Sequence, residues 1–371
     1  MKILILFYGT YPGSSAGAKR MDYYQRGLQQ AGIIAEVLSI TNNNASRFSF
    51  YWSMFSLPLR IAFSFSKVSK GYDATLVYGF GWLSCMLICL IGRFASKKIY
   101  LEINEKPGTF YTSRIGELKL FKYTSLKLTE FSLRFFDGFV AISSALETYL
   151  KPYIKNPNQI IVVPILIDLE RNRISTEKNE ARSPYILHAG ALSDRKDGIG
   201  EVMEAFAMAC KTMGDQLHIY FTSSVAPMAL KVHIQRVISH NSLQDNVHFL
   251  GEITEAELLS YQKSCSMVII NKHLNEQNLY NFPTKLGEYM VVEKPVITTA
   301  IGEMGKYLKD GVNGFIVPLN NVEQLADKIV YVLQNPLDSE RVGKQGRVTA
   351  QEHFNYVMHG IRLANYFKLN K

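Results

Sequence analysis

Short apolar runs alternate with segments of helical periodicity along the first half of the chain. The opening run, residues 2–8, precedes a helix-like segment at 19–31, and a strongly apolar helix is predicted at 81–95. Strands that are apolar almost throughout and alternate with helices form parallel sheets covered on both faces. This half therefore predicts a doubly wound α/β domain with strands at residues 2–8, 35–40, 73–78, 98–103 and 138–142.

A second alternation follows a polar, charged stretch at 168–184 that has no apolar face to bury. Its strands are predicted at 185–189, 216–222, 247–250, 267–271, 295–299 and 314–317, and helices close the chain. The expected fold is α/β, with two Rossmann-like doubly wound domains facing a central cleft where ligands bind. The predicted divisions are an N-terminal domain at 1–170, a linker at 171–184, a C-terminal domain at 185–350, and a helix at 351–371 packing back on the N-terminal domain.

Composition excludes several classes of protein. With 371 residues, 47% of them hydrophobic and 20% charged, the chain is neither disordered nor fibrous. Its four cysteines are too scattered for a disulfide framework, its histidines lack metal-site spacing, and Cys85 and Cys89 are most simply core residues. The start lacks a signal-peptide pattern, and the apolar run 80–92 is shorter than a membrane span. We therefore expect a cytoplasmic protein without a metal or other cofactor.

Positive charge is concentrated in the first half of the chain. Residues 1–170 contain 19 Lys and Arg against 11 Asp and Glu, whereas residues 171–371 contain 22 against 21. A basic domain indicates an anionic partner, although solubility alone is an alternative. Residues 47–70 mix aromatic and basic side chains without any acid, which fits a helix at an anionic membrane surface or a buried helix with cationic ends. No nucleic-acid-binding motif is present.

Two loops with glycine follow predicted first strands. Gly13 and Gly17 precede Lys19 in the first half, in a spacing that matches neither a dinucleotide-binding nor a P-loop motif. In the second half Gly190 follows a strand, and the adjacent cations Arg195 and Lys196 lie further along the same loop. Adjacent cations at the carboxyl end of a strand are suited to neutralise a diphosphate.

The stretch 278–290 contains the most specific pattern. Pro283 and Thr284 stand where a helix would begin, and Lys285 adds a charge to the N–H groups of its first turn, which indicates an anion site. One turn later on the same helix as Leu286, Glu288 is placed to accept both hydroxyls of a ribose.

These segments resemble the glycosyltransferase family 4 type of GT-B enzymes. The resemblance rests on GALSDRK, NVHFLGEI, FPTKLGEYMVVEKPVI and GKYLKDGVNGFIVPLNNVEQLADKI, and more loosely on YLEINEKP and VAISSALETYL. It implies metal-independent transfer of a sugar from a nucleotide sugar with retention of configuration, by a hexosyltransferase-type enzyme in bacterial polysaccharide or glycolipid assembly. The acceptor would be a glycan or a lipid-linked molecule, and the enzyme could be peripheral on the inner face of the cell membrane.

The resemblance also assigns roles. Lys196 matches the family's diphosphate-binding lysine, and Glu288 matches the second glutamate of its E-x7-E signature, which holds the ribose. The first glutamate is replaced by Tyr280 and the usual loop arginine by Ala191, with Arg195 as a replacement for the lost charge. The resulting donor-side residues are Gly190, Arg195, Lys196, Tyr280, Pro283, Thr284, Lys285, Leu286 and Glu288.

Acceptor-side candidates lie in the first half, at Gly13, Gly17, Lys19, Glu102 and Glu105. For both glutamates a structural role is the alternative to acceptor binding or proton removal. The leading hypothesis is a retaining glycosyltransferase. A catalytically silent GT-B scaffold that binds nucleotide or glycan is the alternative, kept open by Tyr280 and Ala191, and a sugar-nucleotide enzyme of another class is the third.

Overall fold

The computed structural model describes residues 1–41, 47–95, 97–108, 119–174, 181–182, 184–223 and 225–370. These residues form two compact units. The first comprises Met1–Leu166 together with Tyr356–Lys371, and the second comprises Ile167–Asn355. Each unit contains its own parallel six-stranded sheet.

The first sheet has the strand order β2-β1-β3-β4-β5-β6, and all neighbouring strands are parallel. Its centre is apolar on both faces because β1 buries five consecutive side chains, as expected of a sheet that helices cover on both sides. The strands are β1 (Lys2–Tyr8), β2 (Ile34–Ile40), β3 (Ala74–Tyr78), β4 (Lys98–Ile103), β5 (Gly138–Ala141) and β6 (Ile160–Val162).

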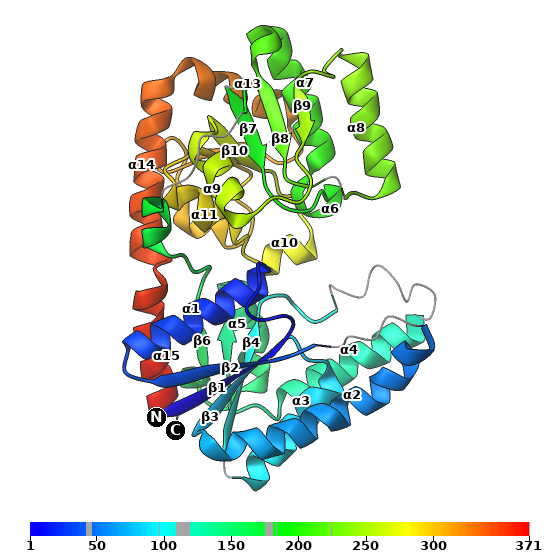
Figure 1. Ribbon diagram of the computed structural model, residues 1–371, viewed down its shortest axis with the longest axis vertical. Coiled ribbons are helices and arrows are strands. Elements are labelled where there is room, and N and C mark those ends of the chain that lie inside the picture. Colours follow the sequence, from blue (N-terminus) through cyan, green and yellow to red (C-terminus); the bar gives the residue numbers. More distant parts are fainter. Residues whose placement is uncertain are drawn as a thin grey trace. The chain divides into compact units, whose positions relative to one another are not determined.

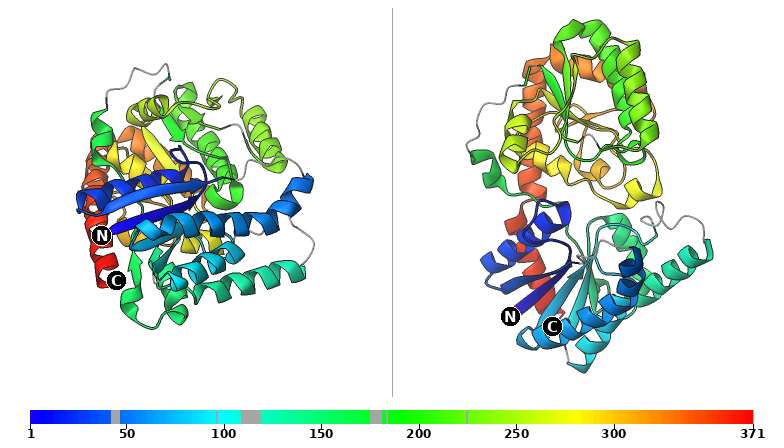
Figure 2. Two further views of the ribbon diagram at one scale, coloured as in Figure 1. Left: turned by 60° about the horizontal axis from the view of Figure 1, so that its bottom comes forward. Right: turned by 45° about the vertical axis from the view of Figure 1, so that its right-hand side comes forward.

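Helices of the first unit lie in two layers (Figures 1 and 2). On one side of the sheet, α1 (Ala16–Gln30) packs against α15 (Tyr356–Leu369). The two helices cross where Gly27 meets Gly360, and a Cβ added to Gly27 would lie 2.7 Å from the carbonyl oxygen of Tyr356. On the other side lie α2 (Arg47–Val68), α3 (Trp82–Phe94) and α4 (Lys119–Leu133), and the short α5 (Ser144–Leu150) follows β5.

The second sheet has the order β12-β11-β10-β7-β8-β9, again with parallel pairing. β7 and β10 are adjacent at its centre, so the loops that follow these two strands meet at one edge of the sheet. The strands are β7 (Tyr185–His188), β8 (His218–Phe221), β9 (Val247–Phe249), β10 (Met267–Ile270), β11 (Val296–Thr298) and β12 (Phe315–Ile316).

The helices of the second unit cover its sheet and form its edge loops. Helix α7 (Ile199–Met213) packs against α8 (Met228–His240) and α13 (Val322–Gln334), while α11 (Lys285–Val291) packs against α14 (Pro336–His353). The remaining helices are α6 (Asp194–Asp197), α9 (Glu255–Ser264), α10 (Glu276–Tyr280) and α12 (Met304–Tyr307).

This architecture confirms the predicted fold class of two Rossmann-like parallel-sheet domains. The first unit ends at Leu166 and the chain returns to it at Tyr356, close to the predicted positions 170 and 351. The second unit begins at Ile167 and not at the predicted position 185, because it includes the segment predicted as a linker. The predicted linker 171–184 lies partly outside the described residues. Where it is described it is folded into the second unit, beginning with the 3₁₀ helix Leu169–Arg173.

Two elements of the first unit were not predicted. Helix α4 carries Lys, Thr and Glu among its apolar residues, and β6 is three residues long and only half-buried, so neither shows a clear period. Within the described part of the chain, no helix is long and apolar enough to span a bilayer.

Candidate functional site

The loop after β7 brings a glycine and a lysine into contact. Gly190 has φ +97°, a value that L side chains rarely adopt. A Cβ at this position would lie 3.0 Å from Cε of Lys285. The loop is held by Gly190 N–H donating to Oγ1 of Thr222 at 2.8 Å and Ala189 N–H donating to the Tyr289 hydroxyl at 3.1 Å. Glycine is required here for both the turn and the approach of the lysine, which links two segments that the sequence analysis selected separately.

The short helix α6 separates its four charged residues. Ser193 caps it by accepting a hydrogen bond from Lys196 N–H at 3.1 Å, and Gly198 ends it in the left-handed conformation with φ +51°. In this turn Arg195 is exposed, Lys196 is half-buried and Asp197 is buried. Asp194 is also exposed, and its Oδ1 accepts a 2.9 Å hydrogen bond from Gly200 N–H, so Asp197 is the buried acid of this turn.

Asp197 lies between two lysines. Its Oδ1 lies 2.7 Å from Nζ of Lys272 and its Oδ2 lies 3.7 Å from Nζ of Lys285. Burial alone would raise the pKa of Asp197, but Lys285 and Lys272 outweigh it and lower that pKa to about 2. The two ammonium groups thus share one carboxylate, and one positive charge remains in excess. We name Asp197, Lys272 and Lys285 the lysine cluster.

Lys272 was not predicted by the sequence analysis. It lies two residues after the end of β10, and β10 is the neighbour of β7 in the sheet, so Lys272 reaches the same edge as the Gly190 loop. Lys272 is only 6% exposed. The signal in the sequence was the polar run Asn271-Lys272-His273 immediately after an apolar strand, but sheet order was needed to place it beside Asp197.

Burial and the repulsion of nearby cations change the pKa of Lys285. Its pKa is lowered because burial and the charges of Lys272 and Lys196 outweigh the attraction of Asp197 and Glu288. A bound anion such as a diphosphate would oppose this effect and favour the charged ammonium group. Lys285 remains 25% exposed at its side chain, so a ligand can reach it.

His188, at the end of β7, should make stability pH-dependent. An unfolded histidine titrates near pH 6.5, whereas burial and then the charge of Lys285 lower the pKa of His188 to about 3. Between these values the unfolded chain binds a proton that the folded chain does not. The free energy of unfolding should therefore fall by about 1.4 kcal/mol per pH unit below pH 6.5 from this group. Urea unfolding at several pH values should show a shallower acid slope for His188→Leu, and equal slopes would contradict the assignment.

Helix α10 is tied to the loop that carries the cations. The Asn275 side-chain amide donates to the Arg195 carbonyl at 2.8 Å, and the Asn278 amide donates to the Lys196 carbonyl at 3.1 Å. Arg195 in turn donates to Oε1 of Gln277 at 3.3 Å. Tyr280 is half-buried at the last position of α10. The segment containing the substituted family glutamate is thus anchored to the predicted diphosphate-binding segment.

Glu288 lies one turn into α11, which begins at Lys285 directly after Pro283 and Thr284, while Leu286 is buried. Oε2 of Glu288 lies 3.8 Å from Nη1 of Arg171 and accepts a 3.5 Å hydrogen bond from the Gln262 amide. Arg171 also contacts Glu255 at 3.1 Å. Arg171 was expected in the linker, and its role beside the predicted ribose-binding carboxylate was missed because the contact joins residues more than 100 positions apart.

In the first unit, Glu102 is held by structural contacts. Its Oε1 accepts a 2.6 Å hydrogen bond from Nε of Arg20, and its Oε2 accepts a 2.8 Å bond from the Tyr24 hydroxyl. Arg20 also donates to the carbonyls of Val163 and Pro164, each at 2.6 Å. Both carboxylate oxygens are engaged in a fully buried ion pair, which favours the structural alternative for this glutamate.

Glu105 has different surroundings. With Asn104, Tyr78 and Trp82 it lines a cavity of about 420 Å³ at the carboxyl ends of β3 and β4. Among the other acceptor-side candidates, Gly13 is exposed and Lys19 is half-buried early in α1. Gly17 lies in the first turn of α1, where a Cβ would lie 3.0 Å from the Tyr78 ring. The glycine loop and the cavity therefore adjoin each other, because Tyr78 lies beside Gly17 and also lines the cavity.

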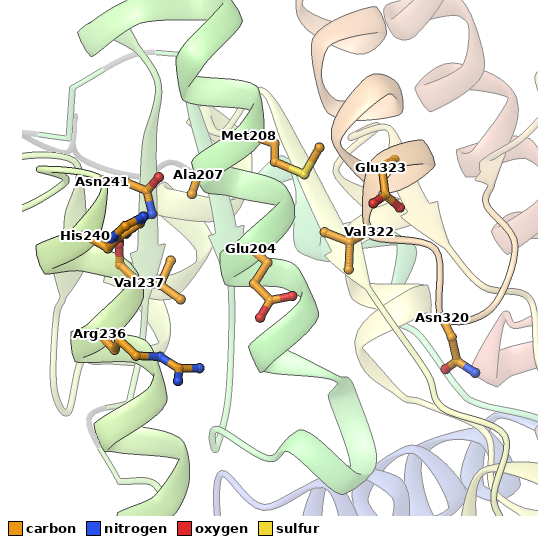
Figure 3. Close-up of a pocket in the computed structure, with 10 residues that line it drawn as sticks. All are labelled: Glu204, Ala207, Met208, Arg236, Val237, His240, Asn241, Asn320, Val322 and Glu323. Carbon is orange, nitrogen blue, oxygen red and sulfur yellow. Dashed lines mark hydrogen bonds between the residues drawn. The ribbon is translucent and has the colours of Figure 1, made fainter.

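A second cavity, of about 670 Å³, lies among α7, α8 and the start of α13 (Figure 3). Glu204, Arg236 and Glu323 are among its lining residues, and none of the predicted site residues lines it. The lysine cluster instead lies at the carboxyl ends of β7 and β10, where parallel α/β sheets bind ligands. We therefore place the candidate ligand site of the second unit at the lysine cluster.

Comparison with known proteins relates the second unit to glycosyltransferases. Residues 170–349 match the family model of glycosyl transferases group 1. An uncharacterized glycosyltransferase of Methanocaldococcus jannaschii is 27% identical over 114 residues, an alignment that spans only 31% of this chain and 31% of that protein. The family-model match at residues 170–349 includes the whole lysine cluster and Glu288.

Solved structures share the fold over nearly the full length. Anabaena HepE in complex with UDP-glucose superposes with a TM-score of 0.72 at 16% identity, covering 100% of both chains. Sucrose-phosphate synthase from Thermosynechococcus elongatus gives 0.74 at 16% identity, covering 99% of this chain and 98% of that one. The fold is therefore GT-B. The match to glycosyl transferases group 1 covers residues 170–349, so it applies to the second unit of this fold.

Proposed function

We propose that this enzyme transfers a sugar from a nucleoside diphosphate sugar to a hydroxyl group of a glycan or lipid-linked acceptor, with retention of configuration and without a bound metal. The lysine cluster carries this proposal. A nucleoside diphosphate leaving group accumulates negative charge as its bond to the anomeric carbon breaks, and the excess positive charge at Lys285 and Lys272 is suited to stabilise it. The structure of HepE with UDP-glucose supports the choice of a nucleotide-sugar donor.

The mechanism is mainly electrostatic. Lys285, with Arg195 and Lys196 on the adjoining turn, would contact the diphosphate, and Glu288 would accept hydrogen bonds from the ribose hydroxyls. The bond from the anomeric carbon to the diphosphate oxygen breaks and a bond to the acceptor oxygen forms on the same face of the sugar. The acceptor proton passes to the departing phosphate oxygen, so no protein base is needed, and because the acceptor oxygen attacks directly, no protein nucleophile is needed. Fixed orientation of the two substrates supplies the remaining rate enhancement.

The acceptor belongs to the first unit in this proposal. The cavity beside Glu105 combines aromatic walls at Phe80 and Trp82 with the polar Asn104, which is the composition of sites that bind amphiphilic ligands. We propose that the enzyme acts in bacterial polysaccharide or glycolipid assembly, as a peripheral protein on the inner face of the cell membrane. The excess of basic residues in the first half supports such a location.

The test is calorimetric titration of the purified protein with UDP, GDP, ADP and their sugar conjugates, with and without Mg²⁺. We expect metal-independent binding of one nucleotide. Glu288→Ala should weaken that binding about tenfold to a hundredfold, because a charged hydrogen bond contributes roughly 1.5–3 kcal/mol. Glu255→Ala is the matched control, since it removes the other carboxylate that contacts Arg171 without touching Glu288.

Two outcomes would contradict parts of the proposal. An unchanged dissociation constant in Glu288→Ala would remove the ribose assignment. Nucleotide binding without any donor hydrolysis or sugar transfer, over a panel of acceptors, would favour the catalytically silent scaffold and make Tyr280 the residue to explain.

A further inference from the structure

Three neighbouring helices of the first unit form one outward face. Helices α2, α3 and α4 lie side by side on the side of the first sheet opposite α1 (Figures 1 and 2). Each buries one side, with Ile61 and Phe65 on α2, Ile88 on α3 and Leu133 on α4 inaccessible to solvent. The opposite side of each helix is therefore turned outward, and we call this surface the three-helix face.

The three-helix face exposes aromatic side chains. Phe63 is 63% exposed, Phe94 is 91% exposed and Phe131 is 49% exposed. Among the described residues only four phenylalanines are more than about a third exposed, and the fourth, Phe249, lies in the second unit. The exposed apolar residues on these helices are Leu59 and Phe63 on α2, Leu90 and Phe94 on α3, and Tyr123, Leu128 and Phe131 on α4. Clustered exposed apolar side chains of this kind mark interaction surfaces.

The charge of the three-helix face has one sign. The segments that form α2, α3 and α4 contain seven Lys and Arg and a single acid, Glu130. Among the described side chains, Arg60, Lys67, Arg93 and Lys127 are exposed. Basic and aromatic groups are also interleaved, since Nζ of Lys67 lies 4.2 Å from the centre of the Phe63 ring and Nζ of Lys127 lies 5.7 Å from that of Tyr123.

We propose that the three-helix face binds the surface of an anionic lipid bilayer. Phe63, Phe94 and Phe131 would enter the boundary between headgroups and acyl chains, while the cations pair with lipid phosphates. A second copy of the chain fits this face poorly, because two faces of the same positive charge would repel each other. A nucleic acid would pair its phosphates with the cations but would leave the phenylalanines in water.

This inference deepens the proposed function by naming the surface that holds the enzyme at the membrane. The binding itself is argued from the exposed residues, and only the reason for membrane attachment rests on the proposed function. It also resolves the two interpretations of residues 47–70. Where side chains are described, α2 is buried along one side and exposes Leu59, Phe63 and Arg60 along the other, so it is both a core helix and a surface helix.

The experiment is co-sedimentation of the full chain with vesicles of phosphatidylcholine alone and of phosphatidylcholine with 30% phosphatidylglycerol. We expect binding to the anionic vesicles only, reduced at least tenfold in the Phe63→Ser/Phe94→Ser/Phe131→Ser variant. The Arg60→Gln/Lys67→Gln/Arg93→Gln/Lys127→Gln variant should lose at least tenfold as well, since each cation near an anionic surface contributes about a factor of five.

Matched controls change equally exposed residues of the second unit. Val225→Ser/Met228→Ser/Leu337→Ser replaces exposed apolar side chains, and Lys211→Gln/Lys231→Gln/Lys309→Gln removes exposed cations. Both controls should bind vesicles as the wild type does. Equal sedimentation of wild type and face variants, equal binding to neutral vesicles, or a dimer in light scattering that the Phe→Ser variant abolishes would each overturn the inference. Nucleotide titration of the same variants keeps the two proposals separate, because donor binding should be unchanged in all of them.

Discussion

Replacing Arg20 by methionine should lower the free energy of unfolding by about 3–5 kcal/mol, a large part of the stability of an ordinary domain. Arg20 is 3% exposed and supplies hydrogen bonds to Glu102 and to two backbone carbonyls that no helix or strand satisfies. Without it the Glu102 carboxylate, which has no exposed side-chain surface, would remain buried with only the Tyr24 hydroxyl as its described partner. Urea unfolding at pH 7 measures the loss.

Two further variants separate this cause from a general effect of losing an arginine. Arg134→Met removes an exposed arginine of the same unit and should cost less than about 1 kcal/mol. Combining Arg20→Met with Glu102→Gln removes both buried charges and should recover part of the loss. A loss of under 1 kcal/mol in Arg20→Met would show that the ion pair does not hold α1 against β4.

Replacing Lys285 by methionine should reduce the turnover number by about 10²–10³, the effect of removing one group that stabilises developing negative charge. Lys285 is the cation that both contacts Asp197 and remains reachable by a ligand. The fold should persist, because Asp197 keeps its shorter contact with Lys272 at 2.7 Å and no buried charge is left without a partner. Steady-state kinetics with the nucleotide sugar identified by titration would measure the change, together with a thermal unfolding curve.

The control is Lys309→Met, which removes an exposed lysine of the same unit and should leave the turnover number unchanged. Lys272→Met provides a contrast, since it removes the closer partner of Asp197 and should lower stability as well as activity. A Lys285→Met enzyme that folds normally and turns over within threefold of the wild type would place the diphosphate elsewhere.

Most elements of the fold were predictable because their apolar patterns are strong. β1 and β4 have the predicted bounds, and most other predicted strands and helices end within a few residues of the observed ones. Among the elements that were missed, α4 and β6 have weak patterns because their stability depends on neighbours in the fold. Local periodicity reports burial on one face of an element, and an element that is only half-buried gives little signal.

The candidate site was predictable in its separate parts. Gly190, Lys285 and Glu288 were selected from motifs within short stretches, where residue type and spacing are sufficient. Their arrangement was not, and the structure added Lys272, Asp197 and Arg171 to the site because strand order and a 3₁₀ helix bring them to it. The assignment of these residues to donor groups remains a prediction.

By itself the sequence determined two parallel α/β units, a basic first half and a glycosyltransferase-like second half, because these properties depend on local pattern and composition. Only the tertiary structure decided which charges meet. It paired Glu102 with Arg20 in the core, 82 residues apart, and placed Lys272 with Asp197, 75 residues apart, beside Lys285. The physical reason is that ion pairs and desolvation depend on distance and burial in space, which strand order and helix packing set and which local sequence does not contain.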